Sequence, residues 1–354
     1  MISEQGNGGV ARRALLAGGL GLAGAVAAGG PAGAAARARG GRRVLVATNE
    51  PWGTYHVQPL LAEAARRRWR LTQLVPDLSQ IAAGDPVPVA TLDDLLAGPH
   101  GRRHPDAYDL LVVAGADDWP LECAARLRHL PMAASSLAYL GPDEAPGARR
   151  LRGRLRVITS SSAAESRAFA GYLGTRRRIR VVGSPQTDGL PARAPEDGLA
   201  LVLTSVTHPD ATGAAAPGTE LLLASAARLA DAGWHILVGL HPREDRTLWE
   251  RYEIADVPSV TASARAQVAI GIPGTVFPLV AAVGTPVVGC VDPALNVPKY
   301  LLDVCSSTIS DAAEATTAAT GAYLPSADVL ADAVGPIGGS AARLLSAWSR
   351  VARG

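Results

Sequence analysis

The residues best suited to bind an anion lie in the second half of the chain, at the ends of two apolar runs. His241 and Pro242 follow the run 235–240, and Gly274 and Thr275 follow the run 268–272. Short apolar runs separated by helix-length segments are typical of buried parallel strands with crossover helices. Ligands of such sheets bind beyond the carboxyl ends of the strands. Thr275 is also expected to open a helix, whose free backbone N–H groups favour a phosphate.

A second pair of residues, suited to acid–base chemistry, lies in the first half. His56 follows the strand-like segment 43–48 and a glycine-containing loop, and Asp117 follows the apolar segment 109–114. An imidazole titrates near neutral pH and can accept a proton from a hydroxyl group, and a carboxylate could orient it. Two simpler roles stay open. His56 could cap or pack at a helix start, and Asp118 could cap the helix that follows it.

These residues need rigid elements to position them, and the apolar pattern supplies two sets. A strand, a glycine-containing loop and a helix over 43–67 form the opening of a doubly wound domain, and a second buried strand begins at residue 199. The segment 189–198 is rich in proline, glycine and charge, as interdomain linkers are. The expected fold is therefore α/β, with two Rossmann-like lobes, 42–188 and 199–354, and a cleft between them.

Three local expectations can be compared directly with a structure. The segment 257–261 is predicted to be a short strand, and 327–352 is predicted to be helical. The segment 141–154, which is rich in glycine, proline and arginine, is predicted to be a surface loop.

Composition limits the classes of function. The chain has 354 residues, 48% of them hydrophobic and 19% charged, which is typical of a folded protein of two ordinary domains. A net charge of +2 argues against nucleic acid as the partner. The three cysteines lack metal-ligand spacing, and no phosphate-binding loop or dinucleotide fingerprint is present. We therefore expect neither a metal nor a cofactor.

Residues 1–41 differ from the rest of the chain and are called the leader here. Arg12 and Arg13 precede a weakly apolar Gly/Ala stretch that ends in small residues, which is the layout of a twin-arginine export signal. Membrane contact is expected only through this segment. The alternative is a low-complexity leader, or a start codon assigned too far upstream, on a cytoplasmic enzyme.

A family resemblance rests on the order of three short motifs. The pair His241-Pro242, the segment 274–277 (GTVF) and the segment 284–287 (GTPV) resemble the C-terminal lobe of GT-B transferases. The nearest branch is the CDP-glycerol glycerophosphotransferases and the HP-motif sialyl- and polysialyltransferases. In those families a His-Pro pair and a Ser-Ser or Ser-Thr pair bind the phosphates of the donor nucleotide.

The resemblance implies roles for several residues. His241, Pro242, Gly274 and Thr275 would hold the donor phosphates, with Gly274 standing where the first serine is usual. The loop after the first strand of the second lobe lies beside those phosphates, so that Ser205 and Thr207 would add hydroxyl hydrogen bonds. His56 would be the general base on the acceptor. Leu279 stands where an acidic residue is usual.

The lobe junction shows a further match to the family. Gly183, Pro185 and Asp188 fit the Gly-x-Pro-Arg-x-Asp sequence of the glycerophosphotransferase branch, and Gln186 replaces its arginine. The simpler reading of Gly183 and Pro185 is a tight exit from a strand.

Together, these features predict a transferase. It would move a glycosyl or glycerophosphate group from a CMP-, CDP- or UDP-linked donor to a hydroxyl acceptor, in cell-envelope or surface-glycan metabolism. The alternative is an exported, non-catalytic GT-B-like protein that binds a glycan or small metabolite. The substitutions at Gly274, Leu279 and Gln186, together with the leader, favour that alternative.

Overall fold

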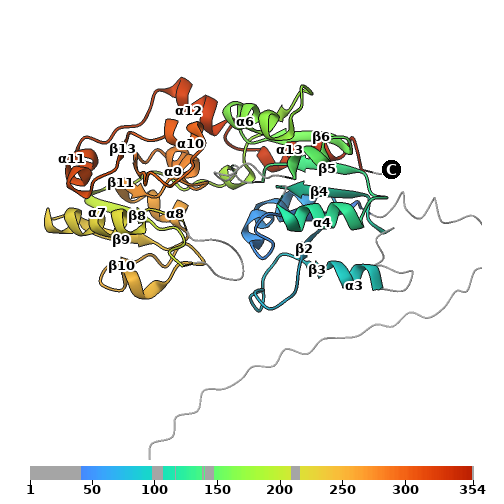
Figure 1. Cartoon of the computed structure of the whole chain (residues 1–354), viewed down its shortest axis with the longest axis horizontal. Coiled ribbons are helices and arrows are strands. Elements are labelled where there is room, and N and C mark those ends of the chain that lie inside the picture. Colours follow the sequence, from blue (N-terminus) through green and yellow to red (C-terminus); the bar gives the residue numbers. More distant parts are fainter. Residues whose placement is uncertain are drawn as a thin grey trace, which may run out of the picture. The chain divides into compact units, whose positions relative to one another are not determined.

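The chain contains two parallel β-sheets, one in each half (Figure 1). The computed structural model describes residues 41–97, 107–115, 117–137, 139, 147–208 and 216–352. The leader therefore lies outside the described residues, apart from residue 41. The expected α/β fold with two Rossmann-like lobes is confirmed.

The first sheet has seven strands in the order β3-β2-β1-β4-β5-β6-β7. The third strand in this order, β1, pairs in parallel with β2 and β4, with Val44 opposite both Leu71 and Leu110. Helices cover both faces of this sheet, which explains why its strands are apolar throughout. The strands are β1 (Arg43–Thr48), β2 (Arg70–Val75), β3 (Val89–Thr91), β4 (Leu110–Ala114), β5 (Met132–Ser135), β6 (Leu155–Ser160) and β7 (Arg180–Val181).

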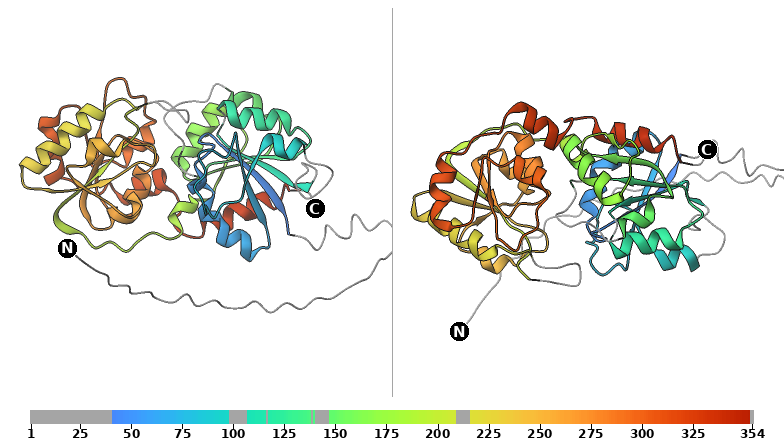
Figure 2. Two further views of the ribbon diagram at one scale, coloured as in Figure 1. Left: turned by 90° about the horizontal axis from the view of Figure 1, so that it is seen from below. Right: turned by 45° about the horizontal axis from the view of Figure 1, so that its top comes forward.

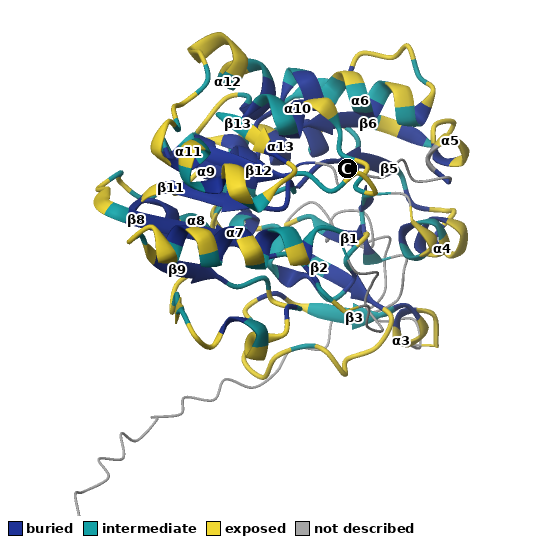
Figure 3. Cartoon of the chain, turned by 60° about the vertical axis from the view of Figure 1, so that its left-hand side comes forward, coloured by how far each residue is buried: buried dark blue, intermediate teal, exposed yellow. Residues whose placement is uncertain are grey.

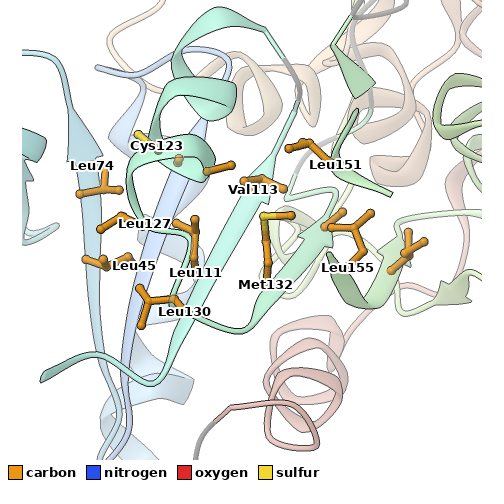
Figure 4. Close-up of a cluster of buried hydrophobic side chains, with 14 of the residues drawn as sticks. Leu45, Leu74, Leu111, Val113, Cys123, Leu127, Leu130, Met132, Leu151 and Leu155 are labelled. Carbon is orange, nitrogen blue, oxygen red and sulfur yellow. The ribbon is translucent and has the colours of Figure 1, made fainter. Parts of the chain in front are cut away.

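Two hydrophobic clusters cover the faces of the first sheet. Figure 4 shows one of them, in which Leu111 and Met132 from neighbouring strands pack with Cys123 and Leu127 of the α4 region. The other contains Val44 and Val46 and receives Leu344 and Trp348 from the last helix. The first-lobe helices are η1 (Thr54–His56), η2 (Gln58–Leu60), α2 (Leu61–Arg66), α3 (Leu92–Ala97), α4 (Asp118–Arg126), α5 (Ala148–Leu151), α6 (Ala163–Leu173) and η4 (Pro185–Thr187).

The second sheet has six strands in the order β10-β9-β8-β11-β12-β13. Its centre is β8, which pairs in parallel with β9 and β11. Figure 3 shows the strands as buried and the outer faces of the helices as exposed, as expected for a sheet covered on both sides. The strands are β8 (Glu196–Leu203), β9 (His235–Gly239), β10 (Glu253–Ile254), β11 (Ala266–Gly271), β12 (Val287–Cys290) and β13 (Ser307–Ile309).

The helices of the second half also pack in two groups. Apolar side chains of α7 join one cluster with Trp249, and those of α9 and α12 join another. These helices are α7 (Thr219–Asp231), η5 (Arg246–Trp249), α8 (Ser259–Ser263), α9 (Phe277–Val283), α10 (Lys299–Asp303), η6 (Ala312–Glu314), α11 (Ala315–Thr320), α12 (Ala327–Val334) and α13 (Ser340–Trp348).

The last helix, α13, packs on the first lobe, although it follows the second in sequence. Figure 2 shows it in red against the sheet that contains the blue β1. The Trp348 indole N–H donates to the Ser135 hydroxyl at 2.8 Å, and Arg67 donates to the Ala342 carbonyl at 2.9 Å. After the second lobe, the chain therefore returns to the first lobe and completes its core with α13.

The residues expected at the lobe junction hold the start of α13. The Asp188 carboxylate accepts the backbone N–H groups of Ser340 and Ala341 at 2.7 and 2.8 Å, which satisfies two free donors at the helix start. Gly183 has φ +84°, and a Cβ there would lie 2.3 Å from the Pro336 carbonyl oxygen. Gly183 is thus required by both its backbone conformation and the close approach of the chain that leads into α13.

Three local expectations differ from the structure. Residues 259–263 form α8, so the strand predicted for 257–261 is wrong; the short strand β10 lies earlier, at Glu253–Ile254. Pro258, which lacks an N–H group, stands at the N-cap of α8 and favours a helix start over a strand. The loop predicted for 141–154 contains α5, and its first part lies outside the described residues. The strand β8 begins at Glu196, inside the segment predicted as linker.

Candidate functional site

Three adjacent strands of the second sheet deliver the expected anion-binding residues to one edge. Ser205 and Thr207 follow β8, His241 follows β9, and Thr275 follows β11. Because β9 and β11 flank β8, the ends of these two strands are about 10 Å apart, which is twice the spacing between strands. All these residues lie at the carboxyl ends of the strands, where ligands of parallel sheets bind.

His241 is held by a tight turn. Its backbone N–H donates to the Thr204 hydroxyl at 2.7 Å, and its carbonyl accepts the Glu244 N–H at 3.0 Å. Its Nδ1 atom accepts the Arg243 backbone N–H at 3.2 Å. A neutral His241 therefore carries its proton on Nε2, which makes Nε2 a hydrogen-bond donor. Pro242 follows directly and is exposed.

Thr207 has a different role from the one expected. Its hydroxyl lies 2.9 Å from Glu244 Oε2, to which it donates, and its backbone N–H donates to Glu244 Oε1 at 3.2 Å. Glu244 is only 8% exposed, so these hydrogen bonds satisfy a buried carboxylate. The Thr207 hydroxyl has a single proton. It donates this proton to Glu244 and so cannot donate it to a ligand. Thr207 therefore fixes the loop beside His241, while Ser205 stays a half-buried hydroxyl at the same edge.

The helix start expected at Thr275 lies two residues further on. The helix α9 begins at Phe277, and Gly274 and Thr275 belong to the turn before it. The Phe277 N–H donates to the Gly274 carbonyl at 3.1 Å, and Pro278 has no N–H. The first helical residues thus offer few free donors to a phosphate, and the expectation that Thr275 opens the helix is wrong. What this turn supplies is the Thr275 hydroxyl itself.

Leu279, where the resemblance leads us to expect an acidic residue, faces the interior. It is 4% exposed and packs with Tyr139, Tyr300 and Leu301. An apolar residue at this position is therefore explained by its packing.

The loop after β1 forms the matching wall in the first lobe. The Thr48 hydroxyl donates to the Glu50 carbonyl at 2.6 Å, and that carbonyl also accepts the Gly53 N–H at 2.9 Å. The buried Gln73 amide donates to the Pro51 carbonyl at 2.7 Å. These bonds fold the loop back on itself and bring residue 50 beside residues 55 and 56.

Glu50 is the carboxylate that lies against His56. Its Oε2 is 3.6 Å from His56 Nε2, and the Tyr55 hydroxyl donates to it. Burial raises the pKa of Glu50, but the contact with His56, the Tyr55 hydroxyl and the charge of His241 outweigh it and lower the pKa to about 2. Burial and the Glu50 charge raise the pKa of Tyr55 above its usual value. Glu50 is thus an anion throughout the neutral range, and Tyr55 is a neutral donor.

His56 itself is mostly covered, with a side chain 14% exposed. Its ring lies against that of Tyr55, with centroids 4.2 Å apart and planes tilted by 45°, and among the described residues its buried Nδ1 has no hydrogen-bond partner. The other ring nitrogen, Nε2, faces Glu50. His56 and Glu50 form a carboxylate–imidazole pair in which each group orients the other.

Asp117 stands at the N-cap position of the helix that follows β4, where its side chain makes no capping hydrogen bond. It is the N-cap residue of α4, and its backbone N–H donates to Asn49 Oδ1 at 3.1 Å. Asp118, expected as the cap, is the first helical residue. The partner expected to orient His56 was Asp117, and the structure places Glu50 in that position.

Residues of both sheets line one pocket of about 270 Å³. Glu50, Tyr55 and Asp85 come from the first lobe, and His241, Pro242 and Arg243 from the second. This volume lies just below the range of about 300–1,000 Å³ usual for ligand pockets, so the pocket suits part of a larger ligand. Its wall carries anionic groups on one side and cationic or donor groups on the other.

Sequence reasoning found His56 and His241 but missed Glu50, Tyr55 and Arg243. The available signal was their position, since all three stand in loops that follow strands at the carboxyl edges of the two sheets. Which of the loop side chains face each other depends on the turns at 50–53 and 241–244, and these leave no spacing pattern in the sequence.

Membrane-spanning helices and metal-ligand clusters are both absent from the described residues. No helix is both long and apolar enough to cross a membrane within the part of the chain that the structure describes. Within the same ranges, no three His, Cys, Asp or Glu residues are grouped as metal ligands would be.

Comparison with known proteins identifies the fold. No protein-family model matches the chain. No curated protein matches it in sequence. Among solved structures, S. aureus MnaA with UDP matches with a TM-score of 0.58 and 10% identity, over 88% of this chain and 96% of that one. The UDP-GlcNAc 2-epimerase of Methanocaldococcus jannaschii, with UDP-GlcNAc and UDP, gives 0.56 and 10%, over 87% and 99%. The wall teichoic acid polymerase TagF gives 0.54 and 11%, over 87% of both chains. The chain thus has the GT-B fold.

Proposed function

We propose that this GT-B-fold chain transfers a glycosyl or glycerophosphate group from a nucleotide-activated donor to a hydroxyl acceptor. The observation that carries the proposal is the pocket in which Glu50 and Tyr55 of one lobe meet His241 and Arg243 of the other. A transferase needs a cationic group on the leaving phosphate and a base on the acceptor, and this pocket offers both within one volume.

On the donor side, His241 and Arg243 bind the phosphates. His241 presents an Nε2 donor, since its Nδ1 accepts a backbone N–H group, and Arg243 adds a guanidinium group. Thr275 and Ser205, at the ends of neighbouring strands, add hydroxyl groups. Stabilising the charge that develops on a leaving phosphate is usually the largest contribution to such a reaction.

On the acceptor side, Glu50 and His56 act as a unit. Glu50 lines the pocket, accepts a hydrogen bond from the acceptor hydroxyl and takes up its proton as that oxygen bonds to the transferred group. His56, whose Nε2 lies 3.6 Å from Glu50 Oε2, orients the carboxylate from behind. This pair makes the first lobe the acceptor side.

The donor class is supported by what the structural neighbours hold. The solved structures named above include UDP or UDP-GlcNAc, and TagF is a wall teichoic acid polymerase. We infer a CMP-, CDP- or UDP-linked donor and an acceptor of the cell envelope or surface glycans.

Nucleotide binding is the first test. Calorimetric titration of CMP, CDP, UDP and GDP should show one of them binding, and His241→Ala should weaken that binding about tenfold or more, since hydrogen bonds to charged groups contribute about 1.5–3 kcal/mol. His235→Ala is the matched control, because His235 begins the same strand at its opposite end and pairs with Glu253 on the surface. Equal nucleotide affinity of His241→Ala and the wild type would contradict the donor site.

Turnover separates the two sides of the pocket. His56→Ala and Glu50→Gln should bind the nucleotide normally and lose about 10²-fold or more in kcat, the usual size of general-base catalysis. Either variant losing nucleotide affinity in proportion to kcat would contradict the acceptor assignment.

One observation favours a binding protein without catalysis. The turn at Gly274 lacks the first of the two hydroxyl groups expected there, so one hydrogen bond to a leaving phosphate is lost. Under this alternative the chain is exported by the leader and holds a glycan or small metabolite in the same pocket. Binding of a nucleotide with product formation from a matching donor would exclude it, and nucleotide-independent glycan binding by protein recovered outside the cell would support it.

A further inference from the structure

The amino edge of the first sheet carries an arginine-rich surface, at the opposite ends of the strands from the pocket. Two neighbouring hollows lie there, of about 300 and 660 Å³, and both are lined by Arg156. The first is also lined by Arg177, Arg178 and Arg180, and the second by Arg128, Arg154 and Arg350. We call these seven arginines the basic edge.

Part of this charge is used within the fold. Arg154 donates to the Ala124 and Leu127 carbonyls, and Arg177 donates to the Leu155 and Arg156 carbonyls. These carbonyl contacts orient the guanidinium groups without neutralising them. Burial, together with the charge of Arg128, lowers the pKa of Arg154, as expected where cations crowd together.

Other members have no partner in the part of the chain that the structure describes. Within the described residues, the side chains of Arg156, Arg178 and Arg350 make no hydrogen bond and no ion pair, and all three are exposed. From residue 147 to residue 187 the only acidic residue is Glu165, which is fully buried. Among the described residues, these three guanidinium groups of the basic edge therefore have no anionic partner.

We propose that the basic edge docks on a membrane surface that carries anionic phospholipid headgroups. Arginine is well suited to phosphate, and basic side chains near an anionic bilayer strengthen binding by roughly fivefold each. The proposal extends the membrane contact expected of the leader to the folded part of the chain, and it does not depend on the nucleotide pocket.

The point where the leader joins the fold favours a membrane over a soluble polyanion. The described chain begins at residue 41, and the Arg42 guanidinium donates to the Ser349 carbonyl, next to Arg350 of the basic edge. The leader is weakly apolar, and stable attachment to a membrane generally takes two weak signals in one chain. Neither hollow has a Phe, Tyr or Trp among its described lining residues, and His129 is the one aromatic ring there, so the row of stacking side chains usual for single-stranded nucleic acid is missing from these hollows.

Vesicle co-sedimentation of the full chain tests the proposal. Binding is compared between vesicles of phosphatidylcholine alone and vesicles containing about one third phosphatidylglycerol, in 0.1 M salt. The leader, which carries Arg12, Arg13, Arg37 and Arg39, contributes to binding in every variant, so the part of the gain on anionic vesicles that is lost on substitution measures the basic edge. Arg156→Gln/Arg178→Gln/Arg350→Gln should lose this gain by at least about tenfold, and 0.5 M salt should abolish it in the wild type.

A matched variant controls for net charge. Arg228→Gln/Arg246→Gln/Arg251→Gln removes three exposed arginines of the second lobe and should keep the wild-type gain within about twofold. Equal melting temperatures of the two triple variants show that both are folded. An undiminished gain in the first triple variant, or no gain in the wild type, would overturn the proposal. So would a single-stranded oligonucleotide or inorganic polyphosphate that binds the basic edge more tightly than the vesicles do.

Discussion

Glu50 and His56 face each other across 3.6 Å, from Oε2 to Nε2, within one turn of the loop that follows the first strand. The pair brings a charged carboxylate and an imidazole together at the carboxyl edge of the sheet. Of the two residues, Glu50 lines the pocket that His241 also lines. A contact of this kind has consequences for stability as well as for chemistry, because it changes the pKa of the carboxylate.

The first prediction concerns acid stability. The pKa of Glu50 is lowered from 4.5 to about 2, so the folded state favours its charged form. Its contribution to the free energy of unfolding is present above about pH 4.5 and is lost as the pH falls toward 2. Because the Glu50 side chain is 43% exposed, solvent screening limits this contribution to roughly 0–1 kcal/mol. Urea unfolding at pH 6 and pH 3 should show a smaller loss for Glu50→Gln than for the wild type.

The exposed Glu250 offers a control for this measurement. Glu250→Gln should lose as much stability between pH 6 and pH 3 as the wild type does. The same loss in Glu50→Gln and in the wild type would show that the Glu50–His56 contact does not form in solution.

The second prediction concerns the start of the last helix. Asp188 accepts two backbone N–H groups there, so Asp188→Ala should lower the free energy of unfolding by about 1 kcal/mol, the usual effect of losing a helix cap. The effect should appear in the first lobe, since α13 supplies Leu344 and Trp348 to its core. Urea unfolding followed by tryptophan fluorescence measures it. Asp197→Ala, at an exposed position with no such contact recorded, should change stability by less than half as much.

The sequence predicted elements better than it predicted partners. The strand 43–48 agrees with β1 residue for residue, because a continuous apolar run between two polar ends has few alternatives. By contrast, Asp188 lies 152 residues from Ser340, and no pattern in either segment predicts the contact between them. The same holds for Glu50, whose approach to His56 depends on the turn made by the Gly53 N–H. For the segment 257–261 the element itself was predicted wrongly. Its apolar residues favour a strand, but Pro258 favours a helix start, and the structure has the helix.

The third prediction uses two glycines with the same backbone conformation. Gly183 has φ +84° and Gly233 has φ +89°, but a Cβ at 183 would meet Pro336 and Ser340 at 2.3 Å, whereas a Cβ at 233 would meet nothing within 4 Å. Gly233→Ala should cost about 1 kcal/mol of unfolding free energy through strain alone. Gly183→Ala should cost about 1–3 kcal/mol more, because the methyl group must displace backbone. Equal melting temperatures of the two variants would show that α13 does not approach the junction this closely.

The fourth prediction concerns Leu279, which stands where the resemblance leads us to expect an acidic residue. In this chain position 279 is 4% exposed and packs in a hydrophobic cluster with Tyr139, Tyr300 and Leu301. Leu279→Glu should therefore lower the free energy of unfolding by about 3–5 kcal/mol, the usual cost of an unpaired buried charge. Leu279→Met, which conserves volume, should cost less than about 1.5 kcal/mol. If Leu279→Glu were instead as stable as the wild type and bound nucleotide more tightly, the side chain would have to reach the ligand, and the packing explanation for Leu279 would be wrong.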